Sequence, residues 1–384
     1  MKRIIFFLLI FFTMTLSAQN KKGISLAFTW KKATQLPGIN GIPSIGVAGP
    51  INGISNDVLI VAGGANFPEG MPWKGGKKFF SDEINVLQKK GDNYVWNNNV
   101  KSKLSFPIGY CGTASTSKGI VCVGGENANG ISKEVFILSW DAKNNAVRLQ
   151  MLPSLPDALT NVAAASIGNI VYIAGGDEKN KSSNRFMCLD ISDTNENWNV
   201  LPDLPFEMAN TSLIAQGKKL YLIGGRTKTA SGISELHHTT FVYDLDKKAW
   251  EDLANICDGK NISNLSAAAS IAIDKNYILM IGGDNGETFN KIETYISQIA
   301  SAATTEEKDK LTKEKNTLIT EHKGFSKKIL LYNIQSDCWI KAGTYPYPAQ
   351  VTTTAVNWNG EILISNGEIK PGVRTPDIIV GKIK

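Results

Sequence analysis

The sequence IVYIAGG, residues 170–176, is a short β-branched run that ends in a pair of glycines. Related stretches recur along the chain: VLIVAGG (58–64), IVCVGG (120–125), LYLIGG (220–225), ILMIGG (278–283) and ILISNG (362–367). Most copies follow a strand-like run of small residues and precede an apolar run with a tryptophan. Each repeat therefore indicates four short β-strands in about 50 residues, and no such unit can bury both of its faces alone.

Repeats of this kind are typical of a kelch-type β-propeller, in which four-stranded sheets stack as blades around an axis. The six glycine signals predict an all-β fold with six blades. After residues 362–367 only one strand, IIVGKI, remains, so the last blade lacks its outer strand. The stretch AFTWKKATQLP, residues 27–37, carries Trp30 and a proline turn. We expect this N-terminal strand to close the last blade, because closure removes an exposed sheet edge.

One repeat is interrupted between its second and third strands. The segment at about residues 285–324 is rich in Glu, Lys, Ala, Leu and Ile at roughly helical spacing, which predicts a helical insertion in the blade before the last. Two interpretations stay open: a solvated surface excursion, or a lid over the mouth of the channel. Apart from this insertion, residues 19–384 are expected to form a single propeller domain.

The first eighteen residues have the pattern of a signal peptide. Lys2 and Arg3 precede an apolar run at residues 4–12, and cleavage after Ala18 fits the small residues before it. The apolar run is too short to span a bilayer as a helix. We expect an exported protein, periplasmic or secreted, that is not inserted in a membrane once the signal is cleaved.

Composition excludes several classes of partner. The net charge of +6 is scattered and forms no basic stripe, which argues against nucleic-acid binding. Five cysteines are too few and too spread for a disulfide framework and are interpreted as packing residues. The three histidines lack metal-ligand spacing, so we expect no metal site. Nothing in the sequence predicts the oligomeric state.

The residue after each glycine signal should lie at one rim of the propeller, because equivalent strands end at the same side. These residues are Ala65, Glu126, Asp177, Arg226, Asp284 and Glu368. Five of the six are ionisable, which favours a polar cavity for a small anionic ligand. After Glu368, a Pro-Gly turn returns the chain so that Arg374 can approach it. This pair is either a local salt bridge or part of a site.

Two stretches carry a resemblance to a known family. GVAGPINGISNDVLIVAGGANFPEGMPW, residues 46–73, and NGEIKPGVRT, residues 366–375, resemble motifs of the sialic acid mutarotases (N-acetylneuraminate epimerases), exported bacterial kelch propellers. Agreement at GGE, residues 124–126, and at the long insertion is weaker. In the best-known members the second motif precedes the first. The order here is similar to that of the cyclically permuted branch of the family.

The resemblance implies an isomerase that interconverts the α- and β-anomers of N-acetylneuraminate without a cofactor. It implies that Glu368 is the catalytic carboxylate and that Arg374 binds the sugar acid. The expected substrate-binding residues are Glu126, Arg226, Asn66, Asp284 and Lys370. The main alternative is a non-catalytic propeller that binds glycans or proteins. A glycoside hydrolase or sialidase ranks below it, because no Asp-box sequence occurs in the chain.

Overall fold

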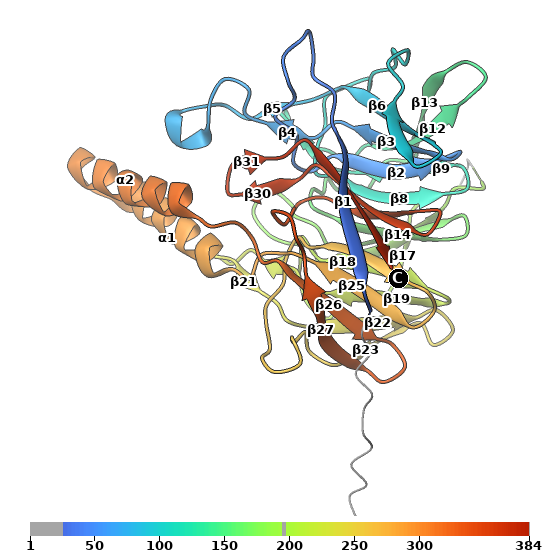
Figure 1. Ribbon diagram of the computed structural model, residues 1–384. Coiled ribbons are helices and arrows are strands. Elements are labelled where there is room, and N and C mark those ends of the chain that lie inside the picture. The colour runs from blue at the N-terminus through green and yellow to red at the C-terminus, as the bar shows by residue number, and fades with distance from the viewer. Residues whose placement is uncertain (1–25, 194–196, 384) are drawn as a thin grey trace, which may run out of the picture.

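The computed structural model describes residues 26–193 and 197–383. The described residues form six four-stranded antiparallel sheets arranged as blades around a central axis (Figure 1). This confirms the predicted six-bladed β-propeller. The predicted signal peptide at residues 1–18 lies outside the described residues. None of the helices in the described part of the chain is long and apolar enough to cross a membrane.

The blades follow the order of the repeats. Blade 1 contains β2 (Ile51–Ser55), β3 (Val58–Ala62), β6 (Ile84–Lys90) and β7 (Asn93–Trp96). Blade 2 contains β8 (Gly112–Thr116), β9 (Gly119–Val123), β12 (Val135–Asp141) and β13 (Ala146–Leu152). Blade 3 contains β14 (Ala163–Ile167), β15 (Ile170–Ala174), β16 (Phe186–Asp190) and β17 (Asn199–Val200). In each of these blades the first strand is innermost, as the small-residue runs predict.

The remaining blades are built in the same way. Blade 4 contains β18 (Ser212–Gln216), β19 (Lys219–Ile223), β22 (Thr240–Asp244) and β23 (Ala249–Asp252). Blade 5 contains β24 (Ala269–Ile273), β25 (Tyr277–Ile281), β26 (Lys328–Asn333) and β27 (Cys338–Thr344). Blade 6 contains β28 (Ala355–Trp358), β29 (Glu361–Ser365), β32 (Asp377–Ile383) and β1 (Phe28–Gln35).

Short hairpins connect the second and third strands of four blades at one face of the ring. They are β4 (Ala65–Asn66) with β5 (Phe79–Phe80), β10 (Glu126–Asn127) with β11 (Gly130–Ile131), β20 (Arg226–Thr227) with β21 (Glu235–Leu236), and β30 (Glu368–Lys370) with β31 (Val373–Arg374). A 3₁₀ turn, η1 (Pro72–Lys74), lies between β4 and β5. These hairpins carry Arg226, Glu368 and Arg374, which belong to the site described below.

The N-terminal strand closes the ring. β1 pairs antiparallel with β32 along its length, with Phe28 opposite Ile383 and Gln35 opposite Asp377. Leu36 extends the pairing by donating its N–H to the carbonyl of Pro376 at 2.7 Å. The prediction that the two ends of the chain share one blade is confirmed, and β32 is not left as an open edge.

Tryptophans join neighbouring blades. Except for Trp73, which lies at the rim, each packs in or against an apolar cluster between two blades, where the sheets diverge. Several also donate the indole N–H to a carbonyl at the end of, or just after, the outer strand of the preceding blade: Trp96 to Gln35 at 2.7 Å, Trp198 to Pro153 at 2.9 Å and Trp339 to Ala254 at 3.0 Å. The indole thus supplies both apolar area and a satisfied polar contact at the wedge.

Backbone hydrogen bonds form a closed ring around the axis, just before the innermost strands. Each residue of the ring donates its N–H to the carbonyl of the equivalent residue in the preceding blade, at 2.8–3.2 Å. The ring consists of Gly49, Tyr110, Asn161, Asn210, Ala267 and Thr352. All six have a left-handed backbone, with φ between 51° and 60°. This conformation costs non-glycine residues roughly 1–2 kcal/mol, so the hydrogen-bonded ring has to hold it in place.

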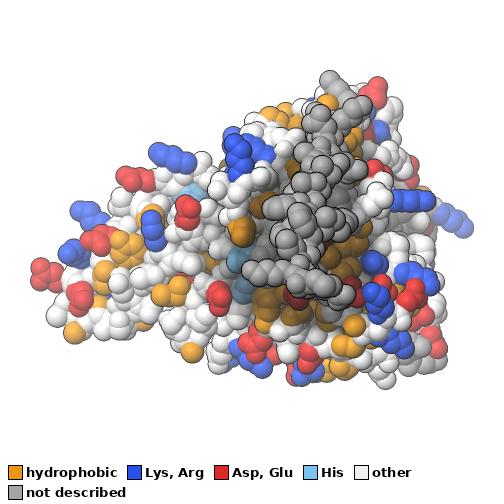
Figure 2. Space-filling view, turned by 90° about the horizontal axis from the view of Figure 1, so that it is seen from below, with side chains coloured by type: hydrophobic (Ala, Val, Ile, Leu, Met, Phe, Trp, Pro, Cys, Tyr) orange, Lys and Arg blue, Asp and Glu red, His pale blue; other side chains and the backbone are white. Residues whose placement is uncertain are grey.

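The insertion of blade 5 is a helical hairpin. α1 (Glu287–Ser301) and α2 (Thr305–Glu321) pack against each other and project from the propeller beside β30 and β31 (Figure 1). The predicted helical insertion is confirmed. Glu293 of α1 accepts hydrogen bonds from Ser234 before β21, and Asn316 of α2 donates to the carbonyl of Trp73. Lys, Arg, Asp and Glu side chains are scattered over the hairpin and the propeller body in Figure 2.

A buried ionic cluster joins blades 6 and 1 beside the ring closure. Glu361 of β29 forms ion pairs with Lys382 of β32 and Lys89 of β6, each at 2.8 Å. It also accepts a hydrogen bond from the hydroxyl of Tyr94 of β7. Its side chain is 5% exposed. Burial alone would raise the pKa of Glu361, but hydrogen bonds from Lys382, Lys89 and Tyr94 outweigh burial and hold the pKa at about 2.

Glu361→Gln is expected to destabilise the protein at neutral pH. It should also make the free energy of unfolding depend less on pH in the acid range. A lowered pKa contributes stability above the ordinary value of 4.5, and this stability is lost as pH falls toward about 2. Urea denaturation followed by tryptophan fluorescence across this range measures the effect. Glu251→Gln is the control, since its pair with Lys247 is well exposed and should contribute at most ~0.5 kcal/mol. Equal changes in both variants would contradict the assignment.

Candidate functional site

The six residues after the glycine signals occupy equivalent positions at one rim. Each forms an isolated antiparallel bridge with a residue just before the hydrogen-bonded ring: Ala65 with Ala48, Glu126 with Gly109, Asp177 with Thr160, Arg226 with Ala209, Asp284 with Ser266 and Glu368 with Val351. The glycine pairs before them have positive φ throughout. In blade 6 Asn366 replaces the first glycine and adopts φ 59°, a conformation that asparagine tolerates.

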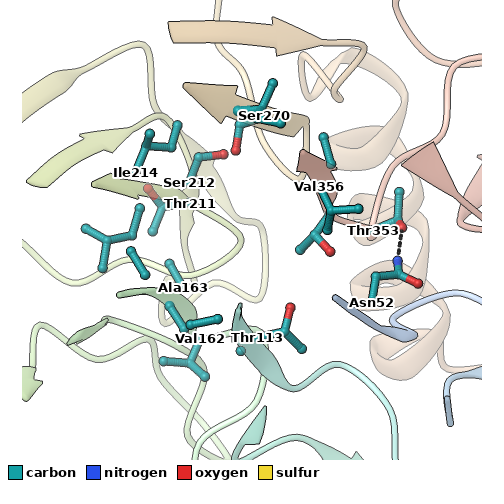
Figure 3. A pocket seen from close by; sticks show the side chains of 18 of the residues that line it. Asn52, Thr113, Val162, Ala163, Thr211, Ser212, Ile214, Ser270, Thr353 and Val356 are labelled. Carbon is teal, nitrogen blue, oxygen red and sulfur yellow. Dashed lines mark hydrogen bonds between the residues drawn. The ribbon is translucent and has the colours of Figure 1, made fainter. Parts of the chain in front are cut away.

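A central channel of about 450 Å³ lies along the innermost strands. Figure 3 shows the hydroxyl, amide and aliphatic side chains that point into it, among them Thr113, Ser212 and Val356. Asn52 donates a hydrogen bond to Thr353 across neighbouring blades at 2.9 Å. The described residues that line this channel include no Asp, Glu, Lys, Arg or His. The channel is therefore a poor place for proton transfer.

A second cavity, of about 250 Å³, lies on the rim and is called the rim cavity here. Its polar side is formed by four ionisable residues: Arg226, Asp284, His322 and Glu368. Its apolar wall comes from Trp73 before β5, from Phe289 and Ile292 of α1, and from Ile319 of α2. Only the base of the helical hairpin thus lines the cavity, while the rest projects away (Figure 1). A small cavity with few convergent polar groups is typical of a small-molecule site.

The β30–β31 hairpin places Glu368 directly opposite Arg374. The Pro371-Gly372 turn reverses the chain, and Gly372 donates its N–H to Glu368 Oε1 at 2.7 Å. The second carboxylate oxygen lies 3.5 Å from Arg374 NH2. The carboxylate is therefore held by a backbone donor and a guanidinium while it also lines the rim cavity.

Arg374 is buried and incompletely paired. Its side chain is 6% exposed, and its guanidinium stacks over the ring of Phe67 at 4.7 Å. NH2 also reaches the hydroxyl of Tyr110 at 3.5 Å. Nε and NH1 have no hydrogen-bond partner, although both atoms are inaccessible to solvent. These two donors lie on different edges of the guanidinium, and buried donors without a partner call for a functional explanation.

Burial shapes the charges of the rim cavity. Burial raises the pKa of Glu368, although Arg374, the Gly372 N–H and Lys78 oppose it. Burial also raises the pKa of Asp284, and it lowers the pKa of His322. Asp284 further raises the pKa of Glu368, because two carboxylates near each other resist double ionisation. Clusters of ionisable groups with shifted pKa values are characteristic of sites that transfer protons.

Arg226 lines the rim cavity, but its charge is already paired. It binds Asp177 of the neighbouring blade through two hydrogen bonds, of 2.6 Å and 3.3 Å, and both residues are buried. Asp177 also accepts hydrogen bonds from Asn161 and Ser182. Removing one member of such a pair would leave the other as a buried charge without a counter-ion. The structure therefore shows a supporting ion pair at this wall of the cavity.

Three other residues expected to bind substrate lie away from the cavity lining. Glu126 pairs with Lys78 at 3.0 Å. Asn66 donates to the carbonyl of Gly46, and its own carbonyl oxygen is buried without a partner. Lys370 forms no ion pair among the described residues. The rim cavity thus gathers Glu368, Asp284 and Arg226 of the predicted set, with Arg374 beside Glu368.

The structure adds residues that the sequence reasoning missed. Tyr110, Phe67 and Lys78 surround Arg374, and Lys78 lies 5.2 Å from the ring of Tyr110. Burial opposes the charge of Lys78, but Tyr110 and Glu126 outweigh it and raise its pKa. His322 follows the end of α2. Tyr110 gave no sequence signal, because tyrosine is not a residue type that marks a left-handed backbone.

Among residues 26–193 and 197–383, no three His, Cys, Asp or Glu side chains are placed to share a metal ion. The buried thiols of Cys111 and Cys122 pack between blades 1 and 2, and burial raises the pKa of Cys111 to about 12. The fold and the rim cavity together define a β-propeller with a candidate site, in which two carboxyl groups line a small cavity and the buried guanidinium of Arg374 lies beside one of them.

Comparison with known proteins identifies the family. The sequence model of the N-acetylneuraminate epimerases matches residues 14–147 and 152–384, and the chain belongs to this family. The N-acetylneuraminate epimerase of Brucella melitensis is 27% identical over 244 residues, which cover 60% of this chain and 59% of that protein. That of Pasteurella multocida is 26% identical over 239 residues, covering 62% and 60%. The chain therefore spans less than two thirds of the relatives it matches.

Gly372→Ala is expected to disturb the site more than its backbone strain alone explains. A Cβ there would lie 3.1 Å from the rings of both Pro72 and Trp73. Gly41 has nearly the same φ, 79° against 80°, and open space around its Cβ position. Gly41→Ala should therefore show only the ~1–2 kcal/mol of left-handed strain. Thermal denaturation of both variants measures the difference, and an equal loss would show that the contact is unimportant.

Proposed function

We propose that this protein is a mutarotase that accelerates the interconversion of the α- and β-anomers of N-acetylneuraminate by acid/base ring opening. Membership of the N-acetylneuraminate epimerase family supports the substrate class. The observation that carries the proposal is the buried Arg374, with two unpaired donors, beside a carboxylate that lines the rim cavity. The export predicted from residues 1–18 would place this activity in the periplasm or outside the cell.

Arg374 would bind the carboxylate of the sugar acid. Its single contact with Glu368 is long, at 3.5 Å, and Nε and NH1 have no hydrogen-bond partner. A carboxylate ligand would form a charge-assisted hydrogen bond with one of these donors and would neutralise the guanidinium. Phe67 covers one face of the guanidinium and so fixes its plane. The geometry thus favours a planar anion over an uncharged sugar.

Glu368 would transfer the proton at the anomeric centre. Opening the ring requires removal of the anomeric hydroxyl proton and protonation of the ring oxygen, after which the ketone recloses on its other face. A positioned carboxylate typically contributes ~10²–10⁴-fold to such a step. The apolar wall from Trp73 and the base of α1 and α2 would limit access of water. No step of this chemistry requires a cofactor.

Glu368→Gln should abolish accelerated mutarotation while the fold is retained. Gln has nearly the same shape and still accepts the Gly372 N–H, but it cannot take a proton. One-dimensional proton NMR of freshly released substrate measures the approach to anomeric equilibrium. Circular dichroism and thermal denaturation check the fold. A variant as fast as the wild type would refute the role of Glu368.

Arg374→Lys should weaken substrate binding about ten- to a hundredfold, as judged from KM, with a smaller effect on kcat. Lysine keeps the charge but loses the planar edge that can hold two carboxylate oxygens. NMR titration with the sugar acid gives the affinity directly. Lys341→Gln is the control, since it removes an exposed charge from β27, the outer strand of blade 5, and Lys341 does not line the rim cavity. An unchanged KM for Arg374→Lys would exclude it as the carboxylate ligand.

A non-catalytic binding propeller is the second candidate, because the same cavity and Arg374 would also suit a receptor for sugar acids. It predicts binding without faster anomer exchange in the wild-type protein. We also propose that the chain belongs to the cyclically permuted branch of the family. The pairing of β1 with β32 supports this, because a ring whose ends meet in one blade tolerates such a permutation.

A further inference from the structure

Asp284 is the rim carboxylate of blade 5, next to Glu368 of blade 6. It follows β25 and bridges to Ser266, as Glu368 follows β29 and bridges to Val351. Both side chains line the rim cavity, and the charge of Asp284 raises the pKa of Glu368. Ring opening needs two proton transfers, one at the anomeric hydroxyl and one at the ring oxygen. The cavity thus holds two carboxyl groups for two transfers.

The partners of the two carboxyl groups differ. Glu368 has Arg374 and the Gly372 N–H. The other cations near the rim already have partners, since Arg226 binds Asp177 and Lys78 binds Glu126. Asp284 accepts one hydrogen bond, from the N–H of Gly286 at 2.9 Å, and forms no ion pair among the described residues. A partly buried carboxyl group without a counter-ion favours its protonated form.

We propose that Asp284 is the second proton-transfer residue of the rim cavity and acts as the acid that protonates the ring oxygen, while Glu368 acts as the base. This inference rests on the proposed mutarotase function. Placing the base beside a guanidinium and the acid away from cations gives one carboxylate and one carboxylic acid in the same cavity. Burial raises the pKa of both carboxyl groups, but Arg374, the Gly372 N–H and Lys78 oppose this shift only at Glu368.

The surroundings of Asp284 define what can influence its protonation. His322 and Glu287 face it in addition to Glu368. His322 lies at the end of α2 and its Nδ1 accepts the N–H of Gly324 at 3.0 Å, so the ring is neutral with its proton on Nε2. Burial lowers the pKa of His322, which keeps it neutral. Glu287 lies in the first turn of α1 and is exposed.

The proposed step balances without any other reactant. Glu368 takes the proton of the anomeric hydroxyl, the oxygen forms the ketone, and the bond from the anomeric carbon to the ring oxygen breaks. Asp284 gives its proton to the departing ring oxygen. After the ketone turns its other face, the hydroxyl returns its proton to Asp284 as it attacks, and Glu368 reprotonates the new anomeric oxygen. Both residues end in their starting forms.

The test compares Asp284→Asn with Glu306→Gln, which removes an exposed carboxylate from the first turn of α2, away from Asp284 and outside the rim cavity. Asp284→Asn should lower kcat by about 10²-fold and should leave KM within about threefold, while Glu306→Gln should match the wild type. Anomer exchange is followed by NMR, with the uncatalysed rate subtracted. Sugar-acid binding and thermal denaturation establish that each variant folds.

Two further readouts separate acid catalysis from a structural role. The wild-type kcat should fall as pH rises through the pKa of Asp284 in the complex, because the acid must carry its proton, and Asp284→Asn should lose this fall. Added formate should partly restore the rate of anomer exchange in Asp284→Ala, because a small carboxylic acid can replace the missing side chain. A purely structural role predicts neither effect.

The outcomes distinguish this inference from the function on which it rests. Wild-type protein that does not accelerate mutarotation would overturn both. Wild-type acceleration that is lost in Glu368→Gln but kept within threefold in Asp284→Asn would overturn the role of Asp284 alone. The role of Asp284 would also be overturned if Asp284→Asn is slow but keeps the wild-type pH profile and formate does not rescue Asp284→Ala.

Discussion

The closed ring of six backbone hydrogen bonds around the axis is the constraint on which the rest of this structure depends. Each blade contributes one residue in a left-handed conformation, and each of these residues is bonded to the one before it. Five of the six are not glycine, so the strain is held by the ring and the blades around it. The rim residues bridge to the chain just before this ring, which is why side chains from six repeats meet at one face.

Because these side chains meet at one face, charged groups lie close together there, and most of them form ion pairs. Arg226 binds Asp177, Lys78 binds Glu126, and Arg374 contacts Glu368. The pairing is incomplete at one place, where Arg374 keeps two unpaired donors and Asp284 lacks a counter-ion. Buried polar groups without partners are rare in folded proteins and call for a functional explanation. The carboxylate of the proposed sugar acid would pair with Arg374, and its ring oxygen would accept the proton of Asp284.

The two cavities illustrate why cavity size does not locate chemistry. The central channel is the larger one but has no strongly ionisable side chain among its described lining residues. The rim cavity is smaller, and it combines carboxyl groups with an apolar wall from the helical hairpin. Only the base of this hairpin reaches the cavity. The insertion was expected to be either a lid or a solvated surface excursion. Its base forms a wall of the rim cavity, and the rest of the helical hairpin projects into solvent.

The sequence by itself determined the six blades, the closing strand and the Glu368–Arg374 hairpin, because these follow from local repeats and one turn. Only the tertiary structure decided which charges stay available. Phe67, Lys78 and Tyr110 come from blades 1 and 2, far along the chain from Arg374, and the pairing of Arg226 with Asp177 joins two repeats. A repeat pattern shows which residues reach the rim, whereas their partners depend on side-chain distances between blades.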